Sequence, residues 1–110
     1  MRELTYTQPL LQLSGTVSAS GDTTLIAAPA SGRQIVISSI QIQNESTTAT
    51  TYLLKFGSTT VYRTLLVSQG DGVTKDMEPA WEVGSGNALV LNLSGANSSN
   101  YNVSYWIDSV

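Results

Sequence analysis

The segment from Gly32 to Asn44 reads GRQIVISSIQIQN and is rich in isoleucine and valine. β-Branched residues lose side-chain freedom in a helix and fit the pleated surface of a sheet. Turn-forming residues stand on both sides, with Ser31 before the segment and Asn44 to Ser46 at its end. We therefore predict a central β-strand here, around which the rest of the chain is arranged.

The apolar pattern of this predicted strand changes along its length. Ile40 and Ile42 alternate with glutamines, which is typical of a sheet with one solvated face, whereas the run from Ile35 to Ile37 is apolar on both faces. Two arrangements would produce this change. In the first, a bulge at Ser38–Ser39 shifts the register of the strand. In the second, one face of the strand packs on the core while the other face meets a second surface, such as a partner subunit.

Further short apolar runs, separated by glycine- and serine-containing turns, follow a strand period and show no helical period. The predicted strands cover residues 11–19, 24–28, 32–44, 50–57, 60–67, 73–83, 88–93 and 101–107. About eight strands at roughly twelve-residue spacing are the signature of a sandwich or barrel. We predict an all-β, single-domain, jelly-roll-like β-sandwich of antiparallel strands.

Two of these strands have more specific predictions. Pro79 lacks a backbone N–H, so residues 73–83 are expected to form an edge strand or two short pieces. Residues 88–93 and 101–107 are expected to pair as a β-hairpin, with the leucine face of one and the aromatic face of the other turned inward.

The first twelve residues are predicted to be an extended N-terminal arm, with the sandwich domain at residues 13–110. Pro9 places the arm outside any central strand. Leu4, Tyr6, Leu10 and Leu11 make the arm apolar. It is either a disordered terminus or a segment that becomes ordered on a neighbouring subunit.

The composition excludes several classes of chemistry. The chain has no cysteine and no histidine, which removes disulfides, Ser-His-Asp and Cys-His catalysis and the usual zinc sites. Asp76 and Glu78 share a strand face, but a solvated surface is a better interpretation of them than a glycosidase pair or a calcium site with Asp71. We expect no catalytic residues, no metal and no cofactor.

Charge and hydropathy narrow the choice of partner. Charged residues make up 12% of the chain, the net charge is −3 and the five basic residues are scattered, so we expect no nucleic-acid partner. The first residues have no continuous apolar run and include Glu3, so we expect neither a secretory signal nor a membrane span.

The apolar strand surface predicted here exceeds what one sandwich of this size can bury, so the surplus is expected to contact other subunits. The predicted interface consists of Leu4, Tyr6, Leu10, Leu11, Ile35, Ile37, Leu53, Leu65 and Trp106. Trp106 has outward parity in the last strand, where an exposed indole would stack on a sugar or fill a pocket in a partner protein. With Trp81 and Tyr105 it forms an alternative set of glycan-stacking residues.

Three segments carry a resemblance to a known group. They are LSGTVSASGDTTLIAA, GRQIVISSIQIQN, and a tryptophan before GSGNALVLNLSGA, with an aromatic strand at the end. Together they resemble small virion proteins of tailed bacteriophages, namely head-decoration (cement) proteins and related jelly-roll modules of fibres and spikes. The motif is a pattern of strands and turns, so no functional residue can be transferred from it.

The resemblance implies a β-sandwich, usually trimeric, on a capsid lattice or at a tail tip. We therefore predict a non-enzymatic decoration protein that stabilises the head as a homotrimer bound to the major capsid protein. Its location would be the virion, after synthesis in the bacterial cytoplasm without secretion. The alternative is a carbohydrate- or receptor-binding module of a tail fibre or spike.

Overall fold

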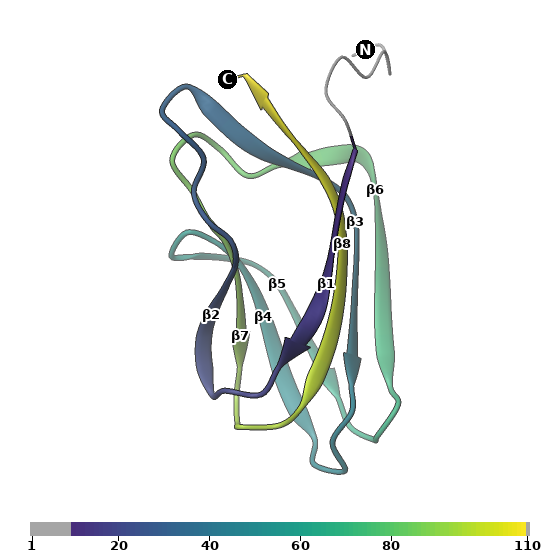
Figure 1. Cartoon of the computed structure of the whole chain (residues 1–110). Coiled ribbons are helices and arrows are strands. Elements are labelled where there is room, and N and C mark those ends of the chain that lie inside the picture. Colours follow the sequence, from purple (N-terminus) through teal and green to yellow (C-terminus); the bar gives the residue numbers. More distant parts are fainter. Residues whose placement is uncertain (1–9, 110) are drawn as a thin grey trace.

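The computed structural model describes residues 10–109, which form eight β-strands and no helix (Figure 1). The strands are β1 (Leu11–Val17), β2 (Gly21–Ile26), β3 (Arg33–Asn44), β4 (Thr50–Phe56), β5 (Thr59–Leu66), β6 (Gly72–Glu82), β7 (Leu89–Leu93) and β8 (Ser99–Ser109). In this part of the chain no helix is long and apolar enough to cross a membrane.

The strands form two antiparallel sheets of four. The first sheet has the order β1-β8-β3-β6 and the second has the order β2-β7-β4-β5. The pairs β1 with β8, β2 with β7, β3 with β6 and β4 with β5 are nested, as if one long hairpin had been folded over into two layers. This is the jelly-roll arrangement, and it confirms the fold predicted from the sequence.

The predicted hairpin between the last two strands is wrong. β7 pairs with β2 and β4 in the second sheet, whereas β8 pairs with β1 and β3 in the first. The connection after Leu93 therefore crosses from one layer to the other. The inward orientation of both strands was predicted correctly, since Leu91 in β7 and Val103 in β8 are buried in the same core.

A β-bulge accounts for the change of parity in β3. The register of β3 against both neighbouring strands shifts between Ile37 and Ser39. Ile37 before the shift and Ile40 after it both point into the core between the sheets, although their parities differ. The bulge, which was one of the two arrangements compatible with the sequence, moves the inward positions from odd to even numbers.

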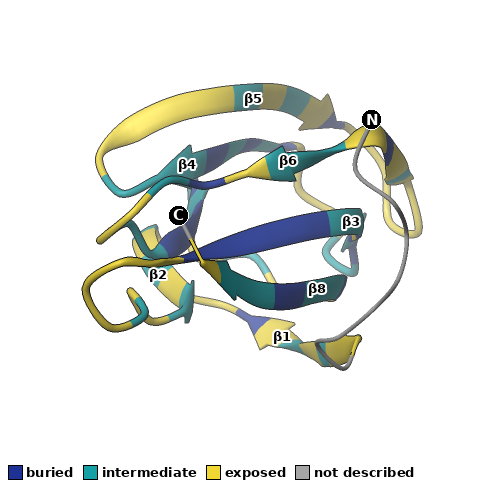
Figure 2. Cartoon of the chain, turned by 90° about the horizontal axis from the view of Figure 1, so that it is seen from above, coloured by how far each residue is buried: buried dark blue, intermediate teal, exposed yellow. Residues whose placement is uncertain are grey.

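The core is made by the inward faces of both sheets, and β3 contributes more buried residues than any other strand (Figure 2). Tyr52 of β4 is fully buried, and its hydroxyl shares a hydrogen bond of 2.6 Å with the hydroxyl of Ser99 in β8. This bond joins the second sheet to the first inside the core. A buried tyrosine is thereby accommodated without an unsatisfied polar atom.

Asn44, at the end of β3, ties three segments together at the far end of the sandwich. Its side chain is fully buried, and its Nδ2 donates to the carbonyl oxygens of Thr48 at 2.9 Å and Leu66 at 3.0 Å. Its Oδ1 accepts from the backbone N–H of Ser46 at 2.9 Å. The amide thus fixes the β3–β4 connection against the end of β5.

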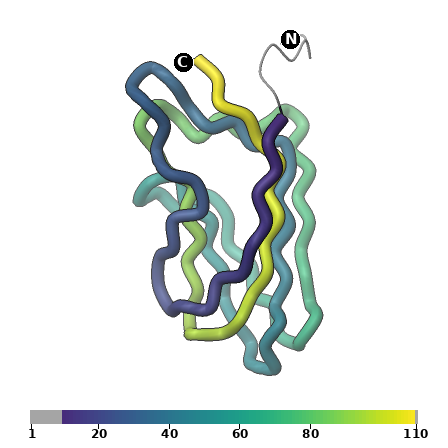
Figure 3. Tube along the Cα trace, viewed as in Figure 1, coloured from purple at the N-terminus to yellow at the C-terminus, as the bar shows by residue number. Residues whose placement is uncertain are grey.

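β6 is an edge strand of the first sheet, which is one of the two forms predicted from Pro79. Its ladder with β3 is interrupted: Trp81 pairs with Ile37, and the next pair is Asp76 with Ser39. Residues 77–80 of β6 therefore have no partner in the β3 ladder, and β6 bends sharply in the upper part of Figure 1. At the other margin, β1 lies beside β8, with Leu11 opposite Tyr105 (Figure 3).

Candidate assembly surfaces and aromatic cleft

The first candidate surface lies on the outer side of the second sheet and is called the β5 surface. It consists of Leu53, Leu65 and Val67. Leu53 pairs with Arg63 and Leu65 pairs with Thr51, so the two leucines are diagonal neighbours on one face. Leu65 is 58% exposed and Val67 is 55% exposed, while Leu53 is half-buried. The structure thus brings together two of the predicted interface residues, and Val67 extends them.

The second candidate surface is the start of β1, called the β1 surface, where Leu10 is 46% exposed and Leu11 is 38% exposed. β1 and β5 end the two sheets on opposite margins of the sandwich (Figure 2). Leu11, which the sequence placed both in the arm and at the start of the first predicted strand, is the first residue of β1. The predicted interface residues Leu4 and Tyr6 lie outside the described residues.

Two predicted interface residues are corrected by the structure. Ile35 and Ile37 have no exposed surface in the single chain and belong to the central core. The sequence suggested a surplus of apolar surface here because apolar residues occupy both odd and even positions from Ile35 to Ile37, which in a regular strand would put them on both faces. The bulge after Ile37 places the isoleucines on both sides of the shift inside the same sandwich, so these side chains are not available to a partner.

The prediction that the indole of Trp106 is exposed is also wrong. It pairs with Val36, whose neighbours Ile35 and Ile37 point into the core, so both side chains are on the outer face of the first sheet. Trp106 is nevertheless only 7% exposed and Val36 only 1%. The parity was predicted correctly, but a large apolar side chain on the outward parity is covered.

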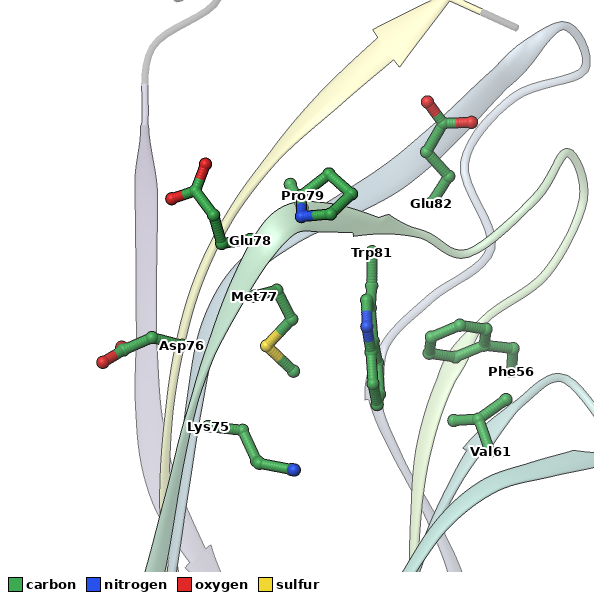
Figure 4. Close-up of a pocket in the computed structure, with 10 residues that line it drawn as sticks. Phe56, Val61, Lys75, Asp76, Met77, Glu78, Pro79, Trp81 and Glu82 are labelled. Carbon is green, nitrogen blue, oxygen red and sulfur yellow. The ribbon is translucent and has the colours of Figure 1, made fainter.

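A cleft of about 690 Å³ opens at the β5–β6 margin (Figure 4). It is lined by β6 residues together with Phe56 of β4 and Val61 of β5: Phe56, Val61, Lys75, Asp76, Met77, Glu78, Pro79, Ala80, Trp81 and Glu82. Trp81, a predicted glycan-stacking residue, is half-buried there. Its ring makes an edge contact with Phe56, with centroids 5.9 Å apart and planes at 80°.

The other two predicted glycan-stacking residues are not at this cleft. Tyr105 packs against the core from β8, and both Tyr105 and Trp81 pair with Ile37 from opposite sides. Trp106 is on the outer face of the same sheet. The sequence did not indicate Phe56 as a cleft residue, because Phe56 of β4 meets Trp81 of β6 only when the two sheets are packed together. Met77 is on the same strand as Trp81, but the sequence did not indicate it as a cleft residue either.

A charged cluster lies beside the β5 surface on the second sheet. Lys55 Nζ forms a salt bridge with Asp22 at 3.0 Å, and Asn92 Nδ2 donates to Asp22 Oδ1 at 2.7 Å. The Asn92 hydrogen bond, followed by the Lys55 hydrogen bond, lowers the pKa of Asp22 below its usual 3.8. Within residues 10–109 no three acidic side chains are grouped so as to hold a metal ion.

No protein-family model matches the sequence, and no curated protein sequence matches it. The fold is similar to solved structures. One is described as Bacillus endospore appendages that form a novel family of disulfide-linked pili, with a TM-score of 0.55 and 12% identity over 94% of this chain and 91% of that chain. Another is PirA, with a TM-score of 0.50 and 15% identity over 86% and 92%.

A third structure is the virus-like particle of the extra small virus of the giant freshwater prawn Macrobrachium rosenbergii. Its TM-score is 0.46, with 11% identity over 96% of this chain and 83% of that chain. At such identities the similarity to the first two structures is one of fold alone. None of the three descriptions mentions a tailed bacteriophage, so the resemblance to phage proteins stays a prediction.

Proposed function

We propose that this chain is a non-enzymatic structural subunit that assembles with copies of itself. The observation that carries the proposal is the β5 surface, where Leu65 and Val67 are both more than half exposed and Leu65 is a diagonal neighbour of Leu53. Apolar side chains exposed together are characteristic of protein interfaces. Full burial of one leucine or valine contributes about 1.5–3 kcal/mol, so covering this surface gives a substantial driving force for association.

The position of the two surfaces favours a head-to-tail contact, of which a closed ring is one form and an open filament the other. The β5 surface and the β1 surface are different and lie on opposite margins of the sandwich. A head-to-tail interface joins two different surfaces and generates rings when the rotation closes, whereas a two-fold interface joins the same surface twice. The smallest head-to-tail ring is a trimer, the oligomer that the phage resemblance implies.

The similarity to the pilus structure supports an assembly role, since that protein forms pili. Those pili are described as disulfide-linked, whereas this chain has no cysteine. Its assemblies would therefore be held by non-covalent contacts alone, and apolar surface such as Leu65 supplies them.

The specific form of the proposal is a decoration protein of a tailed-phage virion. The trimer would bind the major capsid protein of the assembled head, and the chain would be made in the bacterial cytoplasm without secretion. Contacts made only with the assembled shell stabilise that state by mass action. Repetition over a symmetric lattice then multiplies a modest contact energy.

Co-sedimentation with purified phage heads tests this role. We expect the protein to pellet with the heads to saturation and to raise the temperature at which they disassemble. Leu65→Ser is expected to weaken this binding. The matched control is Thr60→Ser, an exposed position on the same strand. A folded protein that never pellets with heads, at any concentration, contradicts the decoration role.

A further inference from the structure

Two apolar side chains on the outer face of the first sheet are covered. Val36 of β3 is 1% exposed, and Trp106 of β8, its partner in the ladder, is 7% exposed. Side chains stand roughly perpendicular to a sheet, so neighbours in the same sheet flank an outward side chain without lying over it. The side chains that flank Trp106 along β8, Ser104 and Asp108, are much smaller than an indole. Burial of the whole indole therefore requires a further segment on this face.

Burial on this outer face is confined to one end. Gln34, Val36 and Trp106, called the covered patch, are buried, whereas Gln41 and Asn102, farther along the same face, are exposed. The described strands all belong to the two sheets and the connections between them are short, so no described strand forms a third layer there. The covering segment must therefore reach this end of the face and not the other.

The chain enters the first sheet beside the covered patch. Leu11 pairs with Tyr105, so the antiparallel register places position 10 level with Trp106 on the neighbouring strand. Pro9 has no N–H with which to extend the ladder. Adjacent strands lie about 4.8 Å apart, so Trp106 is about 5 Å and Val36 about 10 Å across the face from this point. Nine residues precede position 10, and fully extended they reach about 30 Å.

The covered patch is bordered by negative charge. Glu82 pairs with Val36 and Asp108 pairs with Gln34, so both carboxylates have outward parity. The two basic residues of this sheet have inward parity. Asp108, like Trp106, has an interaction partner in the folded chain. A segment that carries a positive charge beside apolar residues is therefore complementary to this face.

We propose that residues 1–9 fold back across the outer face of their own chain and cover the patch. Leu4 and Tyr6 are two residues apart, so an extended segment turns both toward the same side, where they pack on Trp106. Arg2 supplies the positive charge for the bordering carboxylates. The segment thus adds a third layer to the sandwich, and a partner can reach this end of the sheet only if the segment leaves it. The contact lies within one chain and does not depend on the assembly proposal.

The fluorescence of Trp106 tests the proposal in the full chain carrying Trp81→Phe, where Trp106 is the only tryptophan. Leu4→Ser combined with Tyr6→Ser is expected to raise the acrylamide quenching constant severalfold and to shift the emission to longer wavelength, because the indole becomes solvated. In the wild-type protein, nuclear Overhauser effects should connect the indole protons of Trp106 with the Tyr6 ring or the Leu4 methyl groups. This second measurement requires no variant.

Two controls separate this contact from other causes. Thr5→Ser combined with Thr7→Ser changes the same segment on the opposite parity and should leave the quenching constant unchanged. Leu65→Ser, which is expected to give single chains, should leave Trp106 protected. The proposal is overturned if the folded double variant at positions 4 and 6 is quenched no more than its parent, or if the Overhauser effects are absent. It is also overturned if dilution removes the protection, because the segment would then cover a neighbouring subunit.

Discussion

Replacement of Asn44 by alanine is expected to destabilise the fold strongly, although the residue is polar and lies near a loop. The substitution removes the hydrogen bonds to Thr48 and Leu66 and the bond from Ser46. The side chain is fully buried, so its partners lose a protein contact at a place where water has little access. The Leu66 carbonyl is affected most, because its bond to Asn44 is buried.

The magnitude follows from these contacts. A hydrogen bond contributes about 1 kcal/mol net, so the loss of all of them lowers the free energy of unfolding by about 3 kcal/mol. For a domain of this size, this corresponds to a decrease in Tm of roughly 12 °C. At neutral pH, Asn44→Asp should lower the free energy of unfolding more than Asn44→Ala does, because a buried carboxylate then faces two carbonyl oxygens. In acid this loss of stability should become smaller, because the protonated carboxyl group can donate a hydrogen bond.

Urea denaturation followed by circular dichroism, at one protein concentration for all variants, measures these changes. The control is Asn102→Ala, an exposed asparagine whose contact with Gln41 is 3.5 Å long, for which we expect a change below about 0.5 kcal/mol. The account of Asn44 is refuted if Asn44→Ala and the control destabilise the protein equally.

Three further predictions concern the core, the tryptophans and Asp22. Leu91→Ala, at a fully buried position in β7, should lower the free energy of unfolding by about 3–5 kcal/mol, and a value below about 1 kcal/mol would contradict the core described here. In the Trp106→Phe protein the fluorescence of Trp81 should be quenched readily by acrylamide, whereas in the Trp81→Phe protein the fluorescence of Trp106 should be protected; equal quenching would contradict their placement. Because folding lowers the pKa of Asp22, the stabilising effect of its carboxylate should be complete at pH values above 3.8 and be lost as the pH falls through the folded-state pKa. NMR titration should show a higher pKa for Asp22 in the Asn92→Ala variant. An unchanged pKa would contradict the assignment of Asn92 as the main cause of the lowered pKa.

The sequence pattern predicted the faces of the strands better than their partners. Alternation depends on local geometry alone, so the inward positions of Tyr52 and Leu91 could be predicted. Which strand pairs with which depends on how the connections cross between layers. The segments β7 and β8 therefore resembled a hairpin although each pairs in a different sheet.

The burial of Trp106 on the outer face of its sheet could not be predicted from the local sequence pattern either. The parity of Trp106 and the possible bulge near Ser38 were both visible in the sequence, but the low exposure of Trp106, opposite Val36 on the outer face, was not. The same limit applies to the cleft, since Phe56 and Trp81 come from different sheets. Pro79 was the one local signal that β6 departs from a regular ladder.

The assembly proposal is tested most directly by the native mass of the protein in solution. We expect a species of about three times the 11.7 kDa chain mass for the wild type, and single chains for Leu65→Ser and for Leu11→Ser. An equimolar mixture of these two variants should form dimers, because one partner retains an intact β5 surface and the other an intact β1 surface. A wild-type protein that has the mass of a single chain throughout the micromolar range would contradict the account.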